Sequence, residues 1–387
     1  MRKLLKSFKT EINPTEEQKI KIRKTIGTCR FIYNFYLAHN KELHENGEKF
    51  MSSSQFRVWL NNEYLPNNPE CSWIKEAYSK SVTQAVNDGQ TAFTRFFNHK
   101  SAFPKFKKKG RSDVKMYFVR NNPKDCFCER HRIKIPSLGW VRIKEKGYIP
   151  TTKDGYVIKS GHVSIKADRY YVSVLIEIPD KTSASNSSEG IGIDLGLKYF
   201  AVISNSKTYK NINKSTRLKK LEKKLAREQR RLSRKYENLK KGGATKKRNI
   251  QKQKLKIQKL HQRIDNIRTD YINKIIAEIV KTKPSHITIE DLNVSGMMKN
   301  RHLSKAVASQ KFYKFKTKLQ AKCKEYGIEL RIVDRWFPSS RTCHCCKNIK
   351  KDLKLSDRLF RCDCGYIEDR DFNAALNLRD ATTYEVA

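Results

Sequence analysis

Three acidic residues stand where they could bind metal ions. Asp194 lies in the segment GIDLG and Glu290 in the segment IEDLN, and each follows apolar residues typical of a buried β-strand. Asp371 lies in DRDFNAALNL, at or just before the first turn of a helix predicted to continue to Leu378. A carboxylate in apolar surroundings is costly without a partner, so each acid needs a lysine, an arginine or a divalent cation.

Together these acids could perform hydrolytic chemistry. Mg²⁺ prefers oxygen ligands, and two such ions about 4 Å apart can activate water and stabilise the leaving oxygen in phosphodiester cleavage. Strands that end in an acid at one edge of a sheet are where α/β folds place such sites. Each acid alone could instead be the structural partner of a basic side chain, and one of Asp369 and Asp371 could cap the helix. The set of three, in this order, favours the catalytic interpretation.

Four cysteines have the spacing of a structural zinc site. Cys343 and Cys346 form one close pair, and Cys362 and Cys364 form a second pair after fifteen intervening residues. Cys345 competes for the first pair, but the usual knuckle spacing selects Cys343 and Cys346. The second pair is CxC rather than CxxC. A further CxC pair, Cys126 with Cys128, has no second pair nearby and is left unassigned. The remaining cysteines are expected to be core or surface thiols, namely Cys29, Cys71 and Cys323.

The composition indicates a protein that binds a polyanion. The chain has 387 residues, which suggests two or three domains, and its 83 lysines and arginines exceed its 39 acids by 44. It has no run of about 18 apolar residues, and its first residues lack the apolar segment of a secretory signal. Half of the ten cysteines cluster late in the chain, which favours metal binding in a reducing compartment. We therefore expect an intracellular protein, without a membrane partner, that binds nucleic acid.

The elements that must position these residues fall into three stretches. Residues 15–100 have apolar residues at helical spacing and are predicted to be helical, with their aromatic rings packed in a core rather than stacked on bases. From about residue 101 the period changes to two, which predicts an antiparallel β module. A Ser-rich linker at 183–188 leads to an α/β part with a mixed sheet. The elements expected there are strands at 191–195, 199–204, 286–290 and 328–333 and a helix near 304–326.

Two basic segments are candidates for phosphate contacts. Residues 207–263 contain 23 lysines and arginines against three glutamates, with a narrow leucine seam interrupted by Gly242 and Gly243. This pattern predicts two long helices joined in a hairpin, and so high a charge would repel itself without a phosphate backbone against one face. The loop PKFKKKG at 104–110 is the second candidate, although a solvated run of charge explains it equally well.

The motifs taken together resemble those of the TnpB family, the RuvC-type nucleases encoded by insertion sequences and related to type V CRISPR effectors. The resemblance rests on GIDLG, IEDLN and DRDFNAALNL, and on SSRTCHCC at 339–346 with CDCG at 362–365. The segment SKSVTQAVNDGQTAFTRFF at 79–97 is similar to the family's recognition helix, and the loop at 104–110 is similar to its basic loop. It therefore covers most of the chain.

This resemblance implies an RNA-guided DNA endonuclease of a transposable element. Guide RNA pairing would supply sequence choice, and the protein would cut target double-stranded DNA beside a short adjacent motif. The resemblance assigns the family's D–E–D triad to Asp194, Glu290 and Asp371, with two Mg²⁺ ions, and one structural Zn²⁺ to the cysteines. The residues that it implies in nucleic-acid contacts are Lys80, Ser81 and Gln84, as readers of the motif, and Lys105, Lys107, Lys108 and Lys109 of the basic loop.

The resemblance also implies a multidomain α+β fold. A β-barrel wedge domain is expected at 1–14 and 101–182, with a helical recognition domain inserted at 15–100. An RNase H-like (RuvC) α/β domain is expected at 189–338 and 366–387, with the zinc ribbon inserted at 339–365. The expected location is the cytoplasm of a prokaryotic host, in association with the nucleoid.

Other functions use the same residues differently. An RNA-binding or RNA-guided repressor would occupy DNA without cutting it, and the absence of metal-dependent plasmid cleavage would identify it. A strand-transfer recombinase would leave joined transposon ends among its products. A basic RNA-packaging protein would leave the three acids unexplained.

Overall fold

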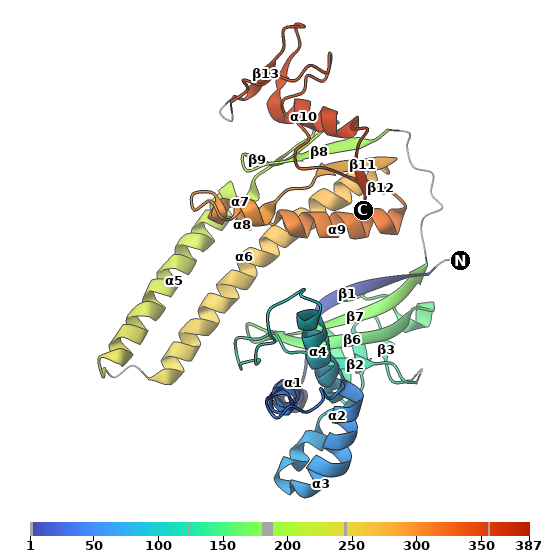
Figure 1. Cartoon of the computed structure of the whole chain (residues 1–387), viewed down its shortest axis with the longest axis vertical. Coiled ribbons are helices and arrows are strands. Elements are labelled where there is room, and N and C mark those ends of the chain that lie inside the picture. Colours follow the sequence, from blue (N-terminus) through green and yellow to red (C-terminus); the bar gives the residue numbers. More distant parts are fainter. Residues whose placement is uncertain (1–2, 123, 180–188, 244–245, 355–356) are drawn as a thin grey trace. The chain divides into compact units, whose positions relative to one another are not determined.

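The computed structural model describes residues 3–122, 124–179, 189–243, 246–354 and 357–387. The contacts divide the chain into two compact units, Met1–Pro179 and Asp180–Ala387 (Figure 1). The linker expected at 183–188 lies outside the described residues, and the boundary between the units falls close to it. None of the described helices is both long and apolar enough to cross a membrane.

The helices of the first unit lie where the apolar spacing predicted them. α1 (Glu16–Glu45) begins after Thr15, whose side chain forms a capping box with Gln18. α4 (Ser79–Phe97) packs against α1, and Gly89 leaves room there for the ring of Tyr36. The rings of Tyr36 and Phe56 are fully buried, so the prediction of core packing is confirmed for both. The shorter elements between these helices are α2 (Ser53–Trp59), a π-helical turn (Leu60–Tyr64), α3 (Leu65–Asn67) and a 3-10 helix (Pro69–Glu76).

A seven-stranded antiparallel sheet makes up the rest of the first unit. Its order is β2-β6-β7-β1-β5-β4-β3, and it encloses one apolar core that includes Phe118 and Val174. The antiparallel module is thus confirmed, but hydrogen bonding among the described residues does not close the sheet into a barrel, because the end strands β2 and β3 do not pair and are very short. The strands are β1 (Lys3–Asn13), β2 (Met116–Val119), β3 (Phe127–Cys128), β4 (Arg132–Ile135), β5 (Gly139–Ile143), β6 (Val157–Lys166) and β7 (Arg169–Pro179).

A mixed six-stranded sheet is the framework of the second unit. Its order is β10-β9-β8-β11-β12-β15, in which β8, β11 and β12 are parallel and the other pairs are antiparallel. Buried residues such as Ile193, Ile289 and Phe315 join the sheet to its helices in one core. The predicted mixed sheet is confirmed. The strands are β8 (Ile191–Leu195), β9 (Tyr199–Ile203), β10 (Thr208–Lys210), β11 (His286–Glu290), β12 (Glu329–Val333) and β15 (Glu385–Val386).

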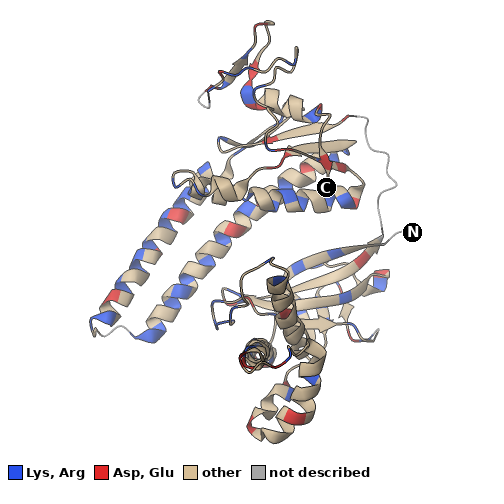
Figure 2. Ribbon diagram, in the orientation of Figure 1, with Lys and Arg blue, Asp and Glu red and all other residues tan. Residues whose placement is uncertain are grey.

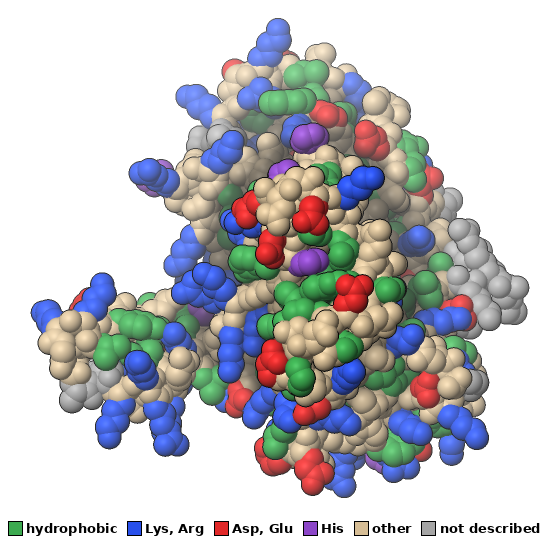
Figure 3. All heavy atoms as spheres, turned by 60° about the horizontal axis from the view of Figure 1, so that its bottom comes forward, with side chains coloured by type: hydrophobic (Ala, Val, Ile, Leu, Met, Phe, Trp, Pro, Cys, Tyr) green, Lys and Arg blue, Asp and Glu red, His purple; other side chains and the backbone are tan. Residues whose placement is uncertain are grey.

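The basic segment forms the helical hairpin that its sequence predicts. α5 (Thr216–Lys240) and α6 (Lys247–Lys281) pack along Leu218, Leu221 and Ile264. Farther along, the buried Gln253 amide donates a hydrogen bond of 2.7 Å to the Glu228 carboxylate, which joins the helices by a polar pair. Lysines and arginines recur along both helices (Figure 2), and Figure 3 shows several of them exposed around the end of the hairpin.

Four further α-helices and a small ribbon complete the described part of the second unit. The single helix expected near 304–326 is divided into α8 (Ser304–Gln310) and α9 (Phe312–Tyr326), because Lys311 between them adopts a left-handed conformation with φ of 59°. α7 (Val294–Met297) precedes them. The ribbon contains β13 (Leu359–Arg361) and β14 (Ile367–Asp369), and α10 (Arg370–Arg379) follows it directly.

Candidate active site and metal centre

Asp194 and Glu290 lie on neighbouring strands. β8 and β11 run parallel, and Ile193 is opposite Ile289. One residue farther along, the same register sets Asp194 beside Glu290 at the carboxyl end of both strands. Because paired positions of a sheet point to the same face, the two carboxylates share a face at one edge, as the sequence predicts.

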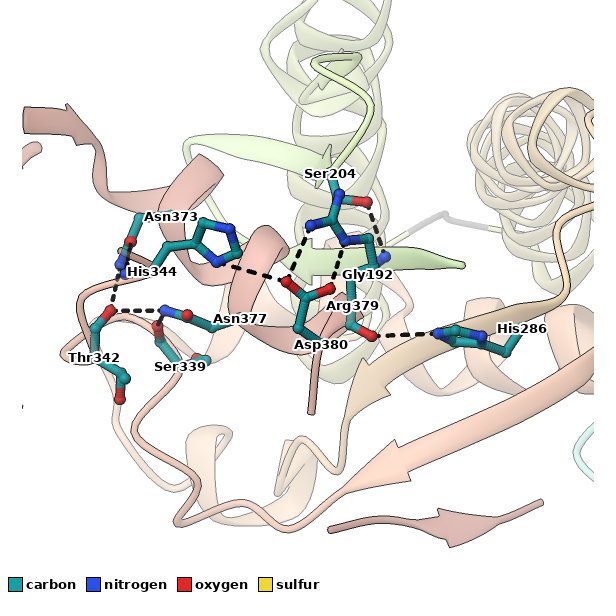
Figure 4. A network of polar contacts seen from close by, with 10 residues as sticks. All are labelled: Gly192, Ser204, His286, Ser339, Thr342, His344, Asn373, Asn377, Arg379 and Asp380. Carbon is teal, nitrogen blue, oxygen red and sulfur yellow. Dashed lines mark hydrogen bonds and ion pairs between the residues drawn. The ribbon is translucent and has the colours of Figure 1, made fainter. Parts of the chain in front are cut away.

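Helix α10 brings Asp371 to that face. Gly192 touches α10 so closely that a Cβ atom there would overlap the carbonyl oxygen of Ala375. Asp194 is two residues beyond Gly192, about 6.6 Å along the strand, and Asp371 is one turn before Ala375, about 6 Å along the helix. The far end of the helix, at Arg379, is bonded to the start of β11, so helix and strand run in opposite directions (Figure 4). These matched advances bring Asp371 and Asp194 together.

The electrostatics of these acids reflect their proximity. Burial raises the pKa of Asp194 well above its usual range, the charges of Glu290 and Asp371 raise it further, and Arg370 acts in the opposite sense. Burial also raises the pKa of Glu290, and a hydrogen bond from the Ser339 hydroxyl partly offsets that rise. Asp194 therefore lies close enough to the other two acids for their charges to act on it, and a nearby cation would offset this repulsion.

Two neighbouring acids are used for structure instead. Asp291 accepts hydrogen bonds from Lys316 and Arg335, each at 2.8 Å, and the bond from Lys316 is the larger cause of the lowered Asp291 pKa. Asp369 caps α10, because its carboxylate accepts hydrogen bonds from two backbone N–H groups of the first turn, one of them that of Asp371 at 2.9 Å. The capping role thus belongs to Asp369, and the carboxylate of Asp371 is left for other contacts.

The acidic site keeps an open arrangement. Asp194, Glu290 and Asp371 are all partly exposed, and the Asp371 carboxylate lies 3.5 Å from the guanidinium of Arg370. Within the described ranges, only the four ribbon cysteines bring three or more ligand atoms within 4.8 Å of one another. The acids thus do not form a compact cage like that of the cysteines, and a looser set of oxygen ligands suits ions that keep water.

The four cysteines selected from their spacing come together. The sulfur atoms of Cys343 and Cys364 are 3.7 Å apart, and those of Cys346 and Cys362 are 3.5 Å apart. A tetrahedron with metal–sulfur bonds of about 2.3 Å has edges of about 3.8 Å, so the spacing fits zinc. Cys345 is exposed and hydrogen-bonds to Cys364, but it is not among the four cysteines whose sulfur atoms all lie within 4.8 Å of one another. The short CxC spacing therefore does not prevent a four-thiol cluster.

Helix α10 also holds the first cysteine pair in place (Figure 4). The Asn377 amide donates hydrogen bonds to the backbone oxygens of Ser339 (2.8 Å) and Thr342 (2.7 Å). The Asn373 amide donates to the same oxygen of Thr342 at 2.8 Å and accepts from the backbone N–H of His344 at 3.1 Å. Both asparagines are buried. One helix therefore carries the third acid, fixes the partner of the second acid and anchors the cysteine cluster.

Comparisons with known proteins place this arrangement in a family. Family models described as "Probable transposase" and "Helix-turn-helix domain", both of the OrfB_IS605 type, match residues 173–301 and 1–49, and a "Cas12f1-like, TNB domain" model matches 312–378. The "Putative RNA-guided DNA endonuclease InsQ" of Escherichia coli (strain K12) is 32% identical over 394 residues, which cover 97% of this chain and 92% of that protein. The "TnpB-like protein L79" of Acanthamoeba polyphaga mimivirus is 33% identical over 127 residues, which cover 31% of this chain and 24% of that protein. The chain belongs to the TnpB family.

The fold of this TnpB-family chain also resembles a solved structure. The similarity to "Cryo-EM structure of the Cas12f1-sgRNA-target DNA complex" has a TM-score of 0.65 at 14% identity and covers 99% of this chain and 100% of that one. The TNB match spans the cysteine cluster. The segment matched by the helix-turn-helix model contains β1 and α1 in its described residues, a strand and one long helix rather than two helices.

The residues implied in nucleic-acid contacts by the family resemblance lie in different surroundings. Lys80 is exposed and Gln84 is partly exposed. Ser81, however, is 1% exposed and its hydroxyl donates to the backbone oxygen of Tyr117 at 2.6 Å. A buried hydroxyl with a partner inside the protein does not reach DNA, so the expectation for Ser81 is corrected: it joins α4 to β2.

The basic loop is likewise divided between surface and structure. Lys105, Lys108 and Lys109 are exposed. Lys107 is partly buried, with its ammonium group 3.6 Å from the centre of the Tyr33 ring and its backbone bonded on both sides to the Asn34 amide. The loop is thus attached to α1 through Lys107, and the other three lysines extend from that attachment.

Sequence reasoning missed three residues of the site in this TnpB-family chain. Ser339 contacts Glu290, and Asn373 and Asn377 hold the loop that contains Ser339. A signal for the asparagines is present, because they are four residues apart on an otherwise apolar helical face, where an amide must have a partner. Ser339 gave no comparable signal, since its partner is 49 residues away in the chain.

Proposed function

We propose that this chain is an RNA-guided DNA endonuclease of a transposable element, which hydrolyses target double-stranded DNA beside a short adjacent motif. The observation that carries the proposal is the placing of Asp371 and Glu290 around Asp194, where each raises the pKa of that acid. The name of the Escherichia coli relative, a putative RNA-guided DNA endonuclease, supports the same function. Guide pairing would choose the sequence, and the protein would bind the duplex by charge and shape.

The proposed active site binds Mg²⁺ through its carboxylates. Asp194 and Asp371 would bind the ions directly, and Glu290 would complete the site. Two bound Mg²⁺ ions supply an activated water and stabilise the leaving oxygen. Ser339 orients the Glu290 carboxylate by its hydrogen bond, and the guanidinium of Arg370, beside Asp371, is available to the negative charge of a phosphodiester.

The four cysteines are proposed to bind one structural Zn²⁺. Their sulfur atoms have the separation that tetrahedral coordination requires, and each would bind as a thiolate. Because the asparagines of α10 attach the first pair to the acidic site, the ion would stabilise the position of Asp371 and of the loop with Ser339. Zinc thus has a structural role near the reacting centre without taking part in the reaction.

We assign the remaining parts to guide and target binding. Residues 1–14 and 101–182 would form the wedge domain and 15–100 the recognition domain. Residues 189–338 and 366–387 would form the RuvC-like nuclease domain, with the zinc ribbon at 339–365. The α5–α6 hairpin would lie along phosphates, because residues 207–263 contain 23 basic residues and only three glutamates.

The test is metal-dependent cleavage by protein purified with its own RNA. The parent complex is expected to cut a plasmid that carries a guide-matched target in Mg²⁺ and not in chelator. Asp194→Ala should lower the cleavage rate by at least about a thousandfold, because it removes several kcal/mol of charge stabilisation. RNA binding by the variant should be unchanged. Cleavage retained by this variant would refute the site, and DNA binding by the parent without cleavage would identify a repressor.

A further inference from the structure

Two aromatic side chains of the second unit are more exposed than any other large apolar side chain that the structure describes. Trp336 is 84% exposed and Tyr313 is 73% exposed. Within the described residues, neither ring is recorded in contact with another ring or with a cation, whereas the exposed Trp73 packs edge-on against Phe31. Large rings presented to water in this way have faces on which a base can stack.

Each ring belongs to a segment that forms an ion pair at the acidic end of β11. Arg335, immediately before Trp336, donates to the Asp291 carboxylate at 2.8 Å. Lys316, one helical turn after Tyr313 on α9, donates to the same carboxylate at 2.8 Å. Asp291 directly follows the proposed catalytic glutamate. The segments that carry the two most exposed rings are therefore both bonded to Asp291, which is joined by one peptide bond to the proposed active site.

The turn that carries Trp336 is held firmly. The backbone N–H of Trp336 donates to the Asp334 carboxylate at 2.8 Å, and that of Phe337 donates to the Asp334 backbone oxygen at 3.0 Å. Ser339, which ends the turn, is buried and bonded to Glu290. The backbone that carries the ring is therefore already ordered, so binding to the ring does not have to pay for ordering the turn.

The surroundings of these rings suit a phosphate backbone. α9 contains five lysines and one glutamate. Burial and the neighbouring charges of Lys314 and Lys322 lower the pKa of Lys318, which indicates how closely the positive charges lie. A basic surface with exposed rings is how proteins bind single strands, since every base has a face that can stack.

We propose that Trp336 and Tyr313 form a stacking platform that holds unpaired bases of single-stranded DNA beside the carboxylates. The proposal rests on the proposed function, because it takes the strand to be the one that is cut. Bases within a duplex are stacked on one another and have no free face, so the platform requires an unpaired strand. DNA is favoured over RNA because the platform adjoins the acids assigned to DNA cleavage.

Photo-crosslinking tests where the strand lies. The RNA-containing complex with Glu290→Gln, in which cleavage should be at least about a hundredfold slower, is irradiated with a short oligothymidylate that carries one 5-iododeoxyuridine. The crosslinked peptides are identified by mass spectrometry. We expect crosslinks at Trp336 or Tyr313. Crosslinks found only elsewhere would overturn the proposal. Preferential crosslinking of the matching oligoribonucleotide at these rings would assign the platform to RNA and also overturn it.

Binding at high salt tests whether the contact is stacking. High salt weakens phosphate-only binding, and an oligothymidylate of about six nucleotides fits a single-strand site. In the complex that also carries Glu290→Gln, Trp336→Ala should weaken binding of this oligothymidylate about 5- to 150-fold, as expected for the loss of about 1–3 kcal/mol of stacking. Trp336→Phe should restore most of the affinity, and Trp73→Ala is the control that should change nothing. A duplex of the same sequence should bind equally well to Trp336→Ala and to the parent.

The outcomes separate this proposal from the proposed function. If the parent complex cuts no DNA but the crosslinks and the loss of binding at Trp336→Ala are observed, the endonuclease assignment fails and the platform stands. If the parent cuts DNA but Trp336→Ala and Tyr313→Ala both bind the oligonucleotide as the parent does, the platform fails and the endonuclease stands. Because Trp336 is so exposed, thermal unfolding of its variants should match that of the parent and exclude misfolding as the cause.

Discussion

The cysteine cluster and the acidic site both collect metal ligands, yet the fold prepares them differently. The four sulfur atoms are already at the distances of a filled site, on short strands and turns with little core of their own. The three acids are fixed to a sheet and a helix with an extensive core, but they do not form a compact cluster. Burial and the charges of the other two acids raise the pKa of Asp194.

The difference follows from the charge of the free ligand. A thiol is neutral until a metal or a base removes its proton, so four thiols can crowd together at little cost. Carboxylates near neutral pH repel one another, so a scaffold must hold them and a cation must balance them. The ribbon should therefore depend on its ion for folding, whereas the sheet should fold first and acquire its ions afterwards.

The largest expected effect distinguishes two adjacent acids. Glu290→Gln should reduce cleavage by at least about a hundredfold, because it removes an anionic ligand from the proposed Mg²⁺ site. Asp291→Asn should reduce it much less, since Asp291 is already paired with Lys316 and Arg335. Plasmid cleavage rates for the two variants, measured with equal RNA occupancy, provide the check. Equal losses would show that the acidic site extends beyond the triad.

Removal of zinc should have the next largest effect. Cys343→Ser should release zinc and unfold the ribbon, because a closed four-thiolate site contributes directly to folding. The core of the mixed sheet should stay folded. Zinc content by elemental analysis and local amide hydrogen exchange provide the measurements, and Cys345→Ser, outside the cluster, is the matched control. A ribbon that stays protected without zinc would contradict the dependence on its ion.

Loss of the connection between the two sites should have a smaller effect. Asn377→Ala leaves the backbone oxygens of Ser339 and Thr342 without this donor and should cost about 1–3 kcal/mol of stability. Cleavage should also fall, because the loop that holds the Ser339 hydroxyl against Glu290 loosens. Thermal unfolding and cleavage are measured together, and unchanged cleavage in a destabilised variant would show that the two sites act independently.

The smallest expected effect is on the thermal stability of the metal-free protein, which depends on the charge of Asp194. The fold raises the pKa of this acid, so it holds a proton more tightly than the unfolded chain does. Its contribution to stability is therefore present at low pH and is lost as the pH rises above the usual carboxyl range. In chelator near neutral pH, Asp194→Asn should raise Tm by about 2–4 °C, the change expected for about 1 kcal/mol in a unit of this size. Calorimetry in chelator from acidic to neutral pH tests this, since the gain should vanish in acid.

Local patterns in the sequence predict the helices and strands but not every break or contact between them. The strands with Asp194 and Glu290, the basic hairpin and the four cysteines follow from apolar period and ligand spacing, which act over a few residues. The helix breaks at position 311, which is a lysine and not the Gly or Pro that usually indicates a break in a helical pattern. This lysine is bonded to Asp265, and the buried Gln310 beside it bonds to Gly196, so distant contacts set the conformation there.

The errors have the same origin. Ser81 has the residue type of a surface contact, but its partner on β2 is 36 residues away and no local pattern reveals it. The β-barrel of the predicted wedge domain is not confirmed, because closing it would need pairing between β2 and β3 that the described strands do not show. Ser339 and the two asparagines of α10 likewise acquire their roles only when distant segments meet.

The close contact at Gly192 has a consequence for recognising inactive relatives. Any side chain there would push α10 away from the strand, because even a methyl group would overlap the backbone at Ala375. A chain could then retain all three acids and lose its activity through a change at a residue that performs no chemistry. A survey that scores such proteins by their acids alone would count that chain as an intact nuclease, so position 192 belongs among the positions that such a survey inspects.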